Sequence, residues 1–195
     1  MKGRVRYLVT ITLLCVVGVM LFYNFSNSEE SDEKESGDQD SGIVSEIDKL
    51  LSKDLKTNYP LTAREVVNLF TRIQKCYYNE DCSSEELVSL SYMATELLDE
   101  ELKAMNPYNE YFSDLQQEIQ QYKNEGKTIS RVIVDKSSEV VYSYVDDVKY
   151  ASINCIYYLK TSNSTEKTIE TYALRKDEED KWKILGWKVY EESEE

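Results

Sequence analysis

The chain has 195 residues, a net charge of −14 at pH 7 and no histidine. Without histidine it cannot build a Ser-His-Asp or Cys-His catalytic site or a histidine-ligated zinc site. The negative charge repels phosphate backbones and anionic lipid surfaces, which argues against nucleic acid as a partner and against a domain that lies on a membrane.

The first predicted element is a hydrophobic span over residues 7–25. It contains no charged residue and no proline, and as a helix it would be about 28 Å long, which nearly matches a bilayer core. Lys2, Arg4 and Arg6 precede it, and an acidic stretch follows it. The positive-inside rule therefore places the basic tail, residues 1–6, in the cytoplasm and the C-terminal part outside. The sequence predicts a single-pass cell-membrane protein held in the lipid bilayer by residues 7–25.

A cleaved signal peptide is the alternative to this anchor. Cleavage needs a shorter apolar region and small residues at the cleavage site, which Ser26 and Ser28 supply only weakly. A lipoprotein is disfavoured because Cys15 lies in the middle of the span and follows Leu14 rather than a small residue. Residues 7–25 are therefore interpreted as a signal anchor, a transmembrane helix that is retained.

Residues 26–42 are predicted to form a disordered acidic tether. Between Glu29 and Asp40 there are seven acidic residues and a single lysine, with almost nothing that a core could bury. Such a segment cannot offset the entropy lost on ordering, and its like charges keep it extended. The tether is interpreted as a spacer between the span and one extracytoplasmic domain over residues 43–195.

The first half of this domain is predicted to be helical. After a short opening helix, capping boxes at Thr62–Glu65 and Ser83–Glu86 start two further helices. Asn106 and Pro107 are predicted to supply the cap and first-turn proline of a fourth helix, which Gly126 ends. The apolar residues at helical spacing are Ile43, Ile47, Leu50, Val66, Leu69, Phe70, Ile73, Tyr77, Leu87, Leu90, Ala94, Leu97, Leu98, Tyr111, Leu115 and Ile119.

After Gly126 the apolar spacing changes to two, which is typical of strands. Asp146-Asp147 is predicted to be a hairpin turn. Helices followed by a meander of strands predict an α+β fold, with three to four helices packed on a curved antiparallel sheet of about four strands. The predicted strands are 129–134 and 140–145, interrupted at 136–138, then 148–160, 168–175 and 181–190.

The order of elements and the closing strand Lys181-Trp-Lys-Ile-Leu-Gly-Trp187 resemble the nuclear transport factor 2-like (cystatin-like) superfold. The resemblance implies a cone in which the sheet wraps a long helix. The chain also resembles an uncharacterised family of membrane-anchored proteins of Gram-positive bacteria, which implies a fold and a topology but no activity. The motifs that carry this second resemblance are Lys53-Asp-Leu, Asn58-Tyr-Pro, Thr62-Ala-Arg-Glu-Val-Val67, Lys75-Cys-Tyr-Tyr-Asn79, Asn106-Pro107, Leu174-Arg-Lys-Asp177 and the closing strand.

Enzymes of that superfold, such as ketosteroid isomerases and dehydratases, place a carboxylate or histidine in the cone beside a tyrosine or a second acid. Here no carboxylate is expected on an inward strand face, and Asp135 and Asp146 are interpreted as turn or edge residues. The leading hypothesis is a non-enzymatic binding or assembly module without cofactor, metal or catalytic residues. The alternative is a small-molecule-binding or enzymatic cone that uses some of the 16 tyrosines with Asp or Glu.

A protein partner or a second copy is compatible with either hypothesis. Tyr150, Ile156 and Tyr158 fall opposite the apolar face of their strand, so a homodimer could cover this side of the sheet.

Two cysteines are candidates for a disulfide. Cys76 is expected near the end of one helix and Cys82 just before the next, so a helix hairpin can bring them within bonding distance. An extracytoplasmic location permits the bond, and free thiols are the alternative.

Overall fold

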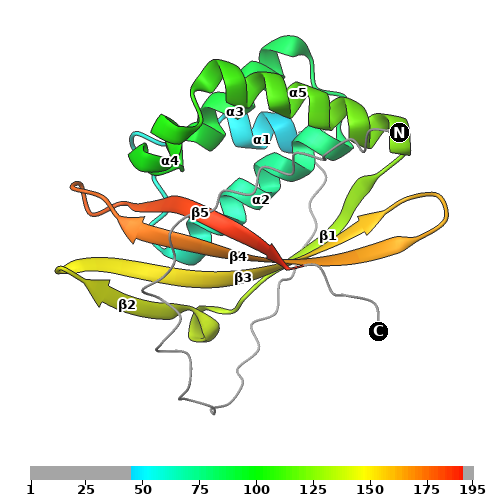
Figure 1. The fold of residues 1–195 in the computed structure, drawn as a ribbon. Helices are drawn as coiled ribbons and strands as arrows, with labels where there is room; N and C mark the ends of the chain where they lie inside the picture. Colours follow the sequence, from blue (N-terminus) through cyan, green and yellow to red (C-terminus); the bar gives the residue numbers. More distant parts are fainter. Residues whose placement is uncertain (1–44, 191–195) are drawn as a thin grey trace, which may run out of the picture. The chain divides into compact units, whose positions relative to one another are not determined.

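The structure, a computed structural model, describes residues 45–190. The predicted basic tail, span and tether lie outside these residues, as do Lys2, Arg4 and Arg6. No helix within the described part is long and apolar enough to cross a membrane. The described residues form an α+β fold in which helices cover one side of an antiparallel sheet (Figure 1).

Five α-helices precede the sheet, one or two more than predicted. They are α1 (Glu46–Leu51), α2 (Ala63–Asn79), α3 (Ser84–Glu96), α4 (Glu100–Met105) and α5 (Tyr108–Glu125). The prediction of one helix running through Leu98 was wrong. The chain leaves α3 because Ile184 N–H donates to Leu97 O at 2.9 Å and Asp99 N–H donates to Ile184 O at 2.8 Å. Asp99 then caps α4 by accepting from Glu101 N–H at 2.9 Å.

The start of α5 also differs from the prediction. Pro107 is itself the N-cap residue, with no side-chain cap, whereas Asn106 ends α4. Gly126 ends α5 as expected, in the left-handed conformation at φ 59° that glycine adopts without steric cost.

Both predicted capping boxes are confirmed. In the first, Glu65 N–H donates to Thr62 Oγ1 at 3.2 Å, and Thr62 N–H donates to Glu65 Oε2 at 3.0 Å. We expect Thr62→Ala to lower the free energy of unfolding by about 1 kcal/mol, because the first turn of α2 loses an acceptor. Urea unfolding of the fragment 43–195 followed by circular dichroism measures this. Thr62→Ser, which keeps the hydroxyl, is the control, and an equal loss in both variants would contradict the role of the cap.

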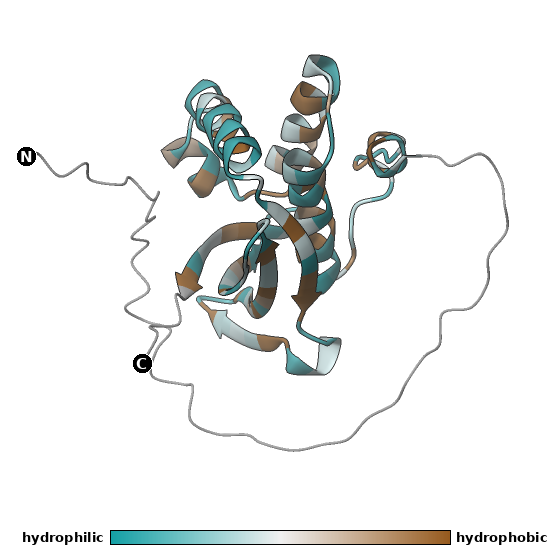
Figure 2. Cartoon of the chain, turned by 90° about the vertical axis from the view of Figure 1, so that its right-hand side faces the viewer, coloured by the Kyte–Doolittle hydropathy of each residue, from teal (hydrophilic) through white to brown (hydrophobic). Residues whose placement is uncertain are grey.

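The sheet has five strands rather than about four: β1 (Thr128–Val134), β2 (Val141–Val145), β3 (Val148–Lys160), β4 (Thr165–Lys176) and β5 (Trp182–Tyr190). Their order is β1-β3-β4-β5, and β2 pairs with the first half of β3 while β1 pairs with the second half. A 3-10 turn at Ser137–Glu139 separates β1 from β2, so the two strands share one side of β3. Figure 2 shows how strongly the strands bend.

The β2–β3 hairpin turn at Asp146 and Asp147 is confirmed, with φ values of 48° and 64°. Asp135 lies at the end of β1, as expected of an edge residue, and its Oδ2 accepts from Asn154 N–H at 2.8 Å. Asp146 is exposed and Asp135 is half-buried. The interpretation of both as turn or edge residues therefore holds.

The core lies between the helices and the inward face of the sheet. On β3 this face carries the predicted residues Ala151, Ile153, Cys155 and Tyr157, all buried. The largest fully buried side chains are Tyr172, Leu50, Ile73, Leu90, Leu97, Leu102, Ile153, Leu174 and Ile184.

A side chain closes the outer edge of β1 at its beginning. Asn79, the last residue of α2, donates through Nδ2 to Ile129 O and accepts from Ile129 N–H, both at 2.8 Å. At the other end of β1, Arg64 Nε donates to Asp135 O at 2.7 Å. Side chains from α2 and its N-terminal turn therefore hold both ends of this strand.

One buried ion pair joins the helices to the sheet. The Asp99 carboxylate accepts from Arg175 Nε at 2.8 Å and from Arg175 Nη2 at 2.7 Å, and Asp99 is only 4% exposed. Arg175 lies on β4, so this bidentate contact fixes the start of α4 against that strand.

Candidate functional site

A chain of hydrogen bonds runs through the interior between the sheet and α2. The hydroxyls of Tyr157 on β3 and Tyr172 on β4 are 2.7 Å apart, and both side chains are buried. Tyr157 Oη also lies 2.7 Å from Gln74 Oε1, and Tyr172 Oη lies 2.7 Å from Glu170 Oε2. Four polar groups therefore make three short contacts in a row.

The two ends of this chain are acceptors. Tyr157 Oη donates to Gln74 Oε1, and Tyr172 Oη donates to Glu170 Oε2. In the contact between the two tyrosines either hydroxyl can be the donor. The chain therefore links the carboxyl group of Glu170 on β4 to the side chain of Gln74 on α2.

The surroundings of Glu170 favour the neutral form of its carboxyl group. The side chain is half-buried on β4, opposite Cys155 in the register with β3. Burial raises the pKa of Glu170 to about 7, and the nearby charge of Glu118 adds to the increase, although the hydrogen bond with Tyr172 opposes it. Glu170 therefore titrates near neutral pH, which is where a proton-exchanging group would be useful.

A second carboxylate stands at the entrance to this region. Glu118 on α5 accepts from Tyr78 Oη at 2.9 Å, and its side chain is exposed. The ring of Tyr78 stacks on that of Tyr122, with the two centroids 4.2 Å apart. Two helices thus place an acid and two aromatic rings over the buried tyrosines.

The space enclosed by these groups is small. The cavity measures about 70 Å³, enough for about two water molecules and far below the roughly 300 Å³ at which drug-sized pockets begin. As it stands, the arrangement can hold water and exchange a proton, but it has no room for a sizeable substrate. The lining residues are Gln74, Tyr78, Glu118, Tyr122, Ile129, Tyr157, Leu159, Thr168 and Glu170.

The expectation that no carboxylate faces inward was therefore wrong. Glu170 lies on the same face of β4 as Thr168, Tyr172 and Leu174, and this spacing of two was the signal in the sequence that could have found it. Glu118 could have been found from helical spacing, because it lies three residues after the buried Leu115 on α5.

The predicted disulfide pair lies at the C-terminal end of α2. Cys76 is buried, Cys82 is half-buried, and both are free thiols here, with Cys82 Sγ 3.6 Å from Cys76 O. Burial raises the pKa of the Cys76 thiol to about 12, so it is not a thiolate at neutral pH. The bond stays a prediction. Of the four cysteines in the chain, two free thiols in the unfolded, non-reduced protein would support it, and four would exclude it.

The outward face of the sheet carries the residues expected to meet a partner. Tyr150, Ile156 and Tyr158 are half-buried on this face, and the Arg131 guanidinium lies 4.4 Å from the centroid of the Tyr158 ring. Arginine thus covers part of the aromatic surface there.

A family model described as a domain of unknown function (DUF6715) matches residues 1–187, which include both the hydrophobic run and nearly all of the described fold. A comparison with curated proteins gives no match.

Proposed function

Because the chain belongs to the family described as a domain of unknown function, DUF6715, we propose from its own residues that it is a non-enzymatic, membrane-anchored binding or assembly module. The observation that carries this proposal is the filled interior. The space beside Glu118 and Glu170 is only about 70 Å³, so a ligand or partner of ordinary size meets the outer surface of the domain instead.

The proposed topology follows from the N-terminal residues. Residues 7–25 span the cell membrane, the tail with Lys2, Arg4 and Arg6 stays in the cytoplasm, and residues 43–195 are outside. We further propose that the outer domain is a nuclear transport factor 2-like cone in a Gram-positive bacterial protein. The order of helices before strands and the bend of the sheet in Figure 2 support the cone.

Protease added to intact cells tests the topology. With an epitope tag at the C-terminus, the expected result is loss of the tag while a cytoplasmic marker stays whole. Changing Lys2, Arg4 and Arg6 together to glutamate should protect the tag in part of the population, since the charge bias is lost. A protected tag in the original chain, or a mature chain that begins near Glu29, would overturn the anchor.

A ligand-binding or enzymatic interior is the second candidate function. The hydrogen-bonded chain from Glu170 to Gln74, with an acid that titrates near neutral pH, is the observation that favours it. Cross-linking of the full chain in its membrane separates the two. A surface module keeps its cross-linked partners when Glu170 is changed to glutamine, whereas a ligand or partner held by the interior is lost from the cross-links of this variant.

The partner itself stays a prediction. Size-exclusion chromatography of residues 43–195 tests whether it is a second copy, and strictly monomeric elution at high concentration would remove that option.

A further inference from the structure

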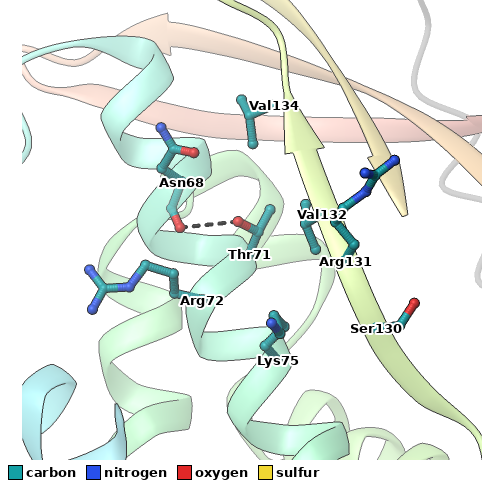
Figure 3. Close-up of a pocket in the computed structure, with 8 residues that line it drawn as sticks. All are labelled: Asn68, Thr71, Arg72, Lys75, Ser130, Arg131, Val132 and Val134. Atoms are coloured by element: carbon teal, nitrogen blue, oxygen red, sulfur yellow. Dashed lines mark hydrogen bonds between the residues drawn. The ribbon is translucent and has the colours of Figure 1, made fainter. Parts of the chain in front are cut away.

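A groove of about 250 Å³ lies between α2 and β1, away from the interior cavity (Figure 3). Asn68, Thr71, Arg72 and Lys75 line it from one face of α2, because residues three, four and seven apart share a side of a helix. The strand side of the groove is formed by Ser130, Arg131, Val132 and Val134.

The charge of this groove is opposite to that of the chain. Acidic residues outnumber basic ones by 37 to 23 in the whole sequence, yet no carboxylate lines the groove and three of its residues are cationic. Long-range repulsion keeps anions away from the chain as a whole, so an anion would be held only by local contacts here.

Two donors in the groove have no partner within residues 45–190. Lys75 is half-buried and makes no hydrogen bond or ion pair there, and the side-chain amide of Asn68 has no hydrogen bond either. Thr71 is different, because its buried hydroxyl donates to Asn68 O at 3.0 Å. The Lys75 ammonium and the Asn68 amide, about two helical turns apart on α2, are therefore available to an acceptor.

The two arginines contribute unequally. Arg72 Nε donates to Glu46 Oε1 at 2.7 Å and its Nη2 lies 2.6 Å from the same oxygen, and Figure 3 shows its guanidinium on the side of α2 away from β1. Arg131 turns toward the outer face of the sheet, where it stacks on Tyr158, and Figure 3 shows its guanidinium pointing away from α2. Lys75 is therefore the cation that an anion in the groove would meet first.

The strand side can add backbone donors. β1 pairs with β3 along one edge and with no other strand in the described part of the chain. The free edge of a strand presents unpaired N–H groups, and Asn79 and Arg64 bond only its two ends. The middle of this edge borders the groove at Val132 and Val134.

We propose that the groove binds a phosphate-type oxyanion, with Lys75 as the charge partner and the Asn68 amide and the free edge of β1 as hydrogen-bond donors. Cationic donors favour the doubly charged phosphate over a carboxylate. The groove is larger than a bare oxyanion requires, so a phosphate ester fits as well as the free ion. This inference rests on one part of the proposed function, which is that the domain binds its ligand or partner on its outer surface.

Titration of the full chain in nonionic detergent with inorganic phosphate tests the site, followed by NMR shifts of the backbone amides. Saturable shifts are expected at Asn68, Lys75 and Val132, and Lys75→Gln should weaken binding about tenfold, the effect of losing one charge-assisted contact. Lys56→Gln is the matched control, because Lys56 is an exposed lysine outside the groove. Absence of saturation, or equal weakening by both variants, would overturn the proposal.

Two further probes identify the source of the phosphate. Glycerol 3-phosphate that binds the same amides more tightly than inorganic phosphate supports an ester, and the reverse order supports the free ion. Binding to phosphatidylglycerol vesicles while both soluble probes fail would overturn the proposal. Phosphatidylcholine vesicles, which carry no net charge, then show whether the vesicle binding is a non-specific charge effect. A failed topology experiment leaves these titrations unchanged, so the two proposals fail separately.

Discussion

Replacing Glu170 with glutamine is expected to raise the free energy of unfolding by about 2 kcal/mol at pH 8 and to change it little at pH 4.5. The pKa of Glu170 is about 7 in the folded state and about 4.3 for an unfolded glutamate. Between these values the folded state holds one proton more, so stability falls as pH rises and the loss is complete above pH 7. Glutamine stays neutral and can donate to Tyr172, which completes the hydrogen-bonded chain.

Urea unfolding of residues 43–195 at pH 4.5, 6 and 8 measures this effect. Glu166→Gln is the matched control, since Glu166 lies on the same strand with a side chain that is 59% exposed. A variant that is less stable than the original chain at pH 8, or a gain of the same size at pH 4.5, would show that Glu170 is not held as a neutral acid.

Replacing Asp99 with asparagine is expected to lower the free energy of unfolding by about 3 kcal/mol at pH 7, because Arg175 loses a buried bidentate partner. Asparagine can still cap α4, so the loss reports the ion pair. Burial acts to raise the pKa of Asp99, but the hydrogen bonds from Arg175 and the Glu101 N–H outweigh it and lower the pKa. The contribution is therefore present above the unfolded pKa of about 3.9 and is lost as pH falls through the folded value.

Denaturant unfolding at pH 7 and pH 3 checks both parts of this prediction. Glu101→Gln is the control, because Glu101 lies 3.2 Å from the same guanidinium but is 52% exposed, so its loss should cost well under about 1 kcal/mol. Similar losses in the free energy of unfolding for the two variants would mean that burial of Asp99 does not strengthen its ion pair with Arg175.

Local signals in the sequence were enough to place much of the fold. Capping boxes at Thr62 and Ser83, the left-handed Gly126 and the Asp146-Asp147 turn each depend on neighbouring residues only, and the structure contains all of them. The break between α3 and α4 could not be found this way. It depends on backbone bonds from Leu97 and Asp99 to Ile184, which is more than 80 residues away along the chain.

The candidate site depends on the same kind of distant contact. Tyr157 was placed on the inward face correctly, but the role of Glu170 emerges only when β4 is in register with β3 and the carboxyl group meets Tyr172. Lys75 belonged to a recognised motif, yet its position beside β1 follows from the packing of α2 on the sheet. Periodicity indicates which way a side chain points but not which groups it meets there.

The amide of Asn79 imitates a neighbouring strand at the beginning of β1, whereas β2 has nothing comparable within residues 45–190. All five residues of β2 are exposed, among them Tyr144 at 68%. An unprotected apolar edge is where fibril-like or amorphous aggregation starts in β-proteins. If concentrated preparations of this domain precipitate, a lysine introduced at Tyr144 is the change that should keep them in solution.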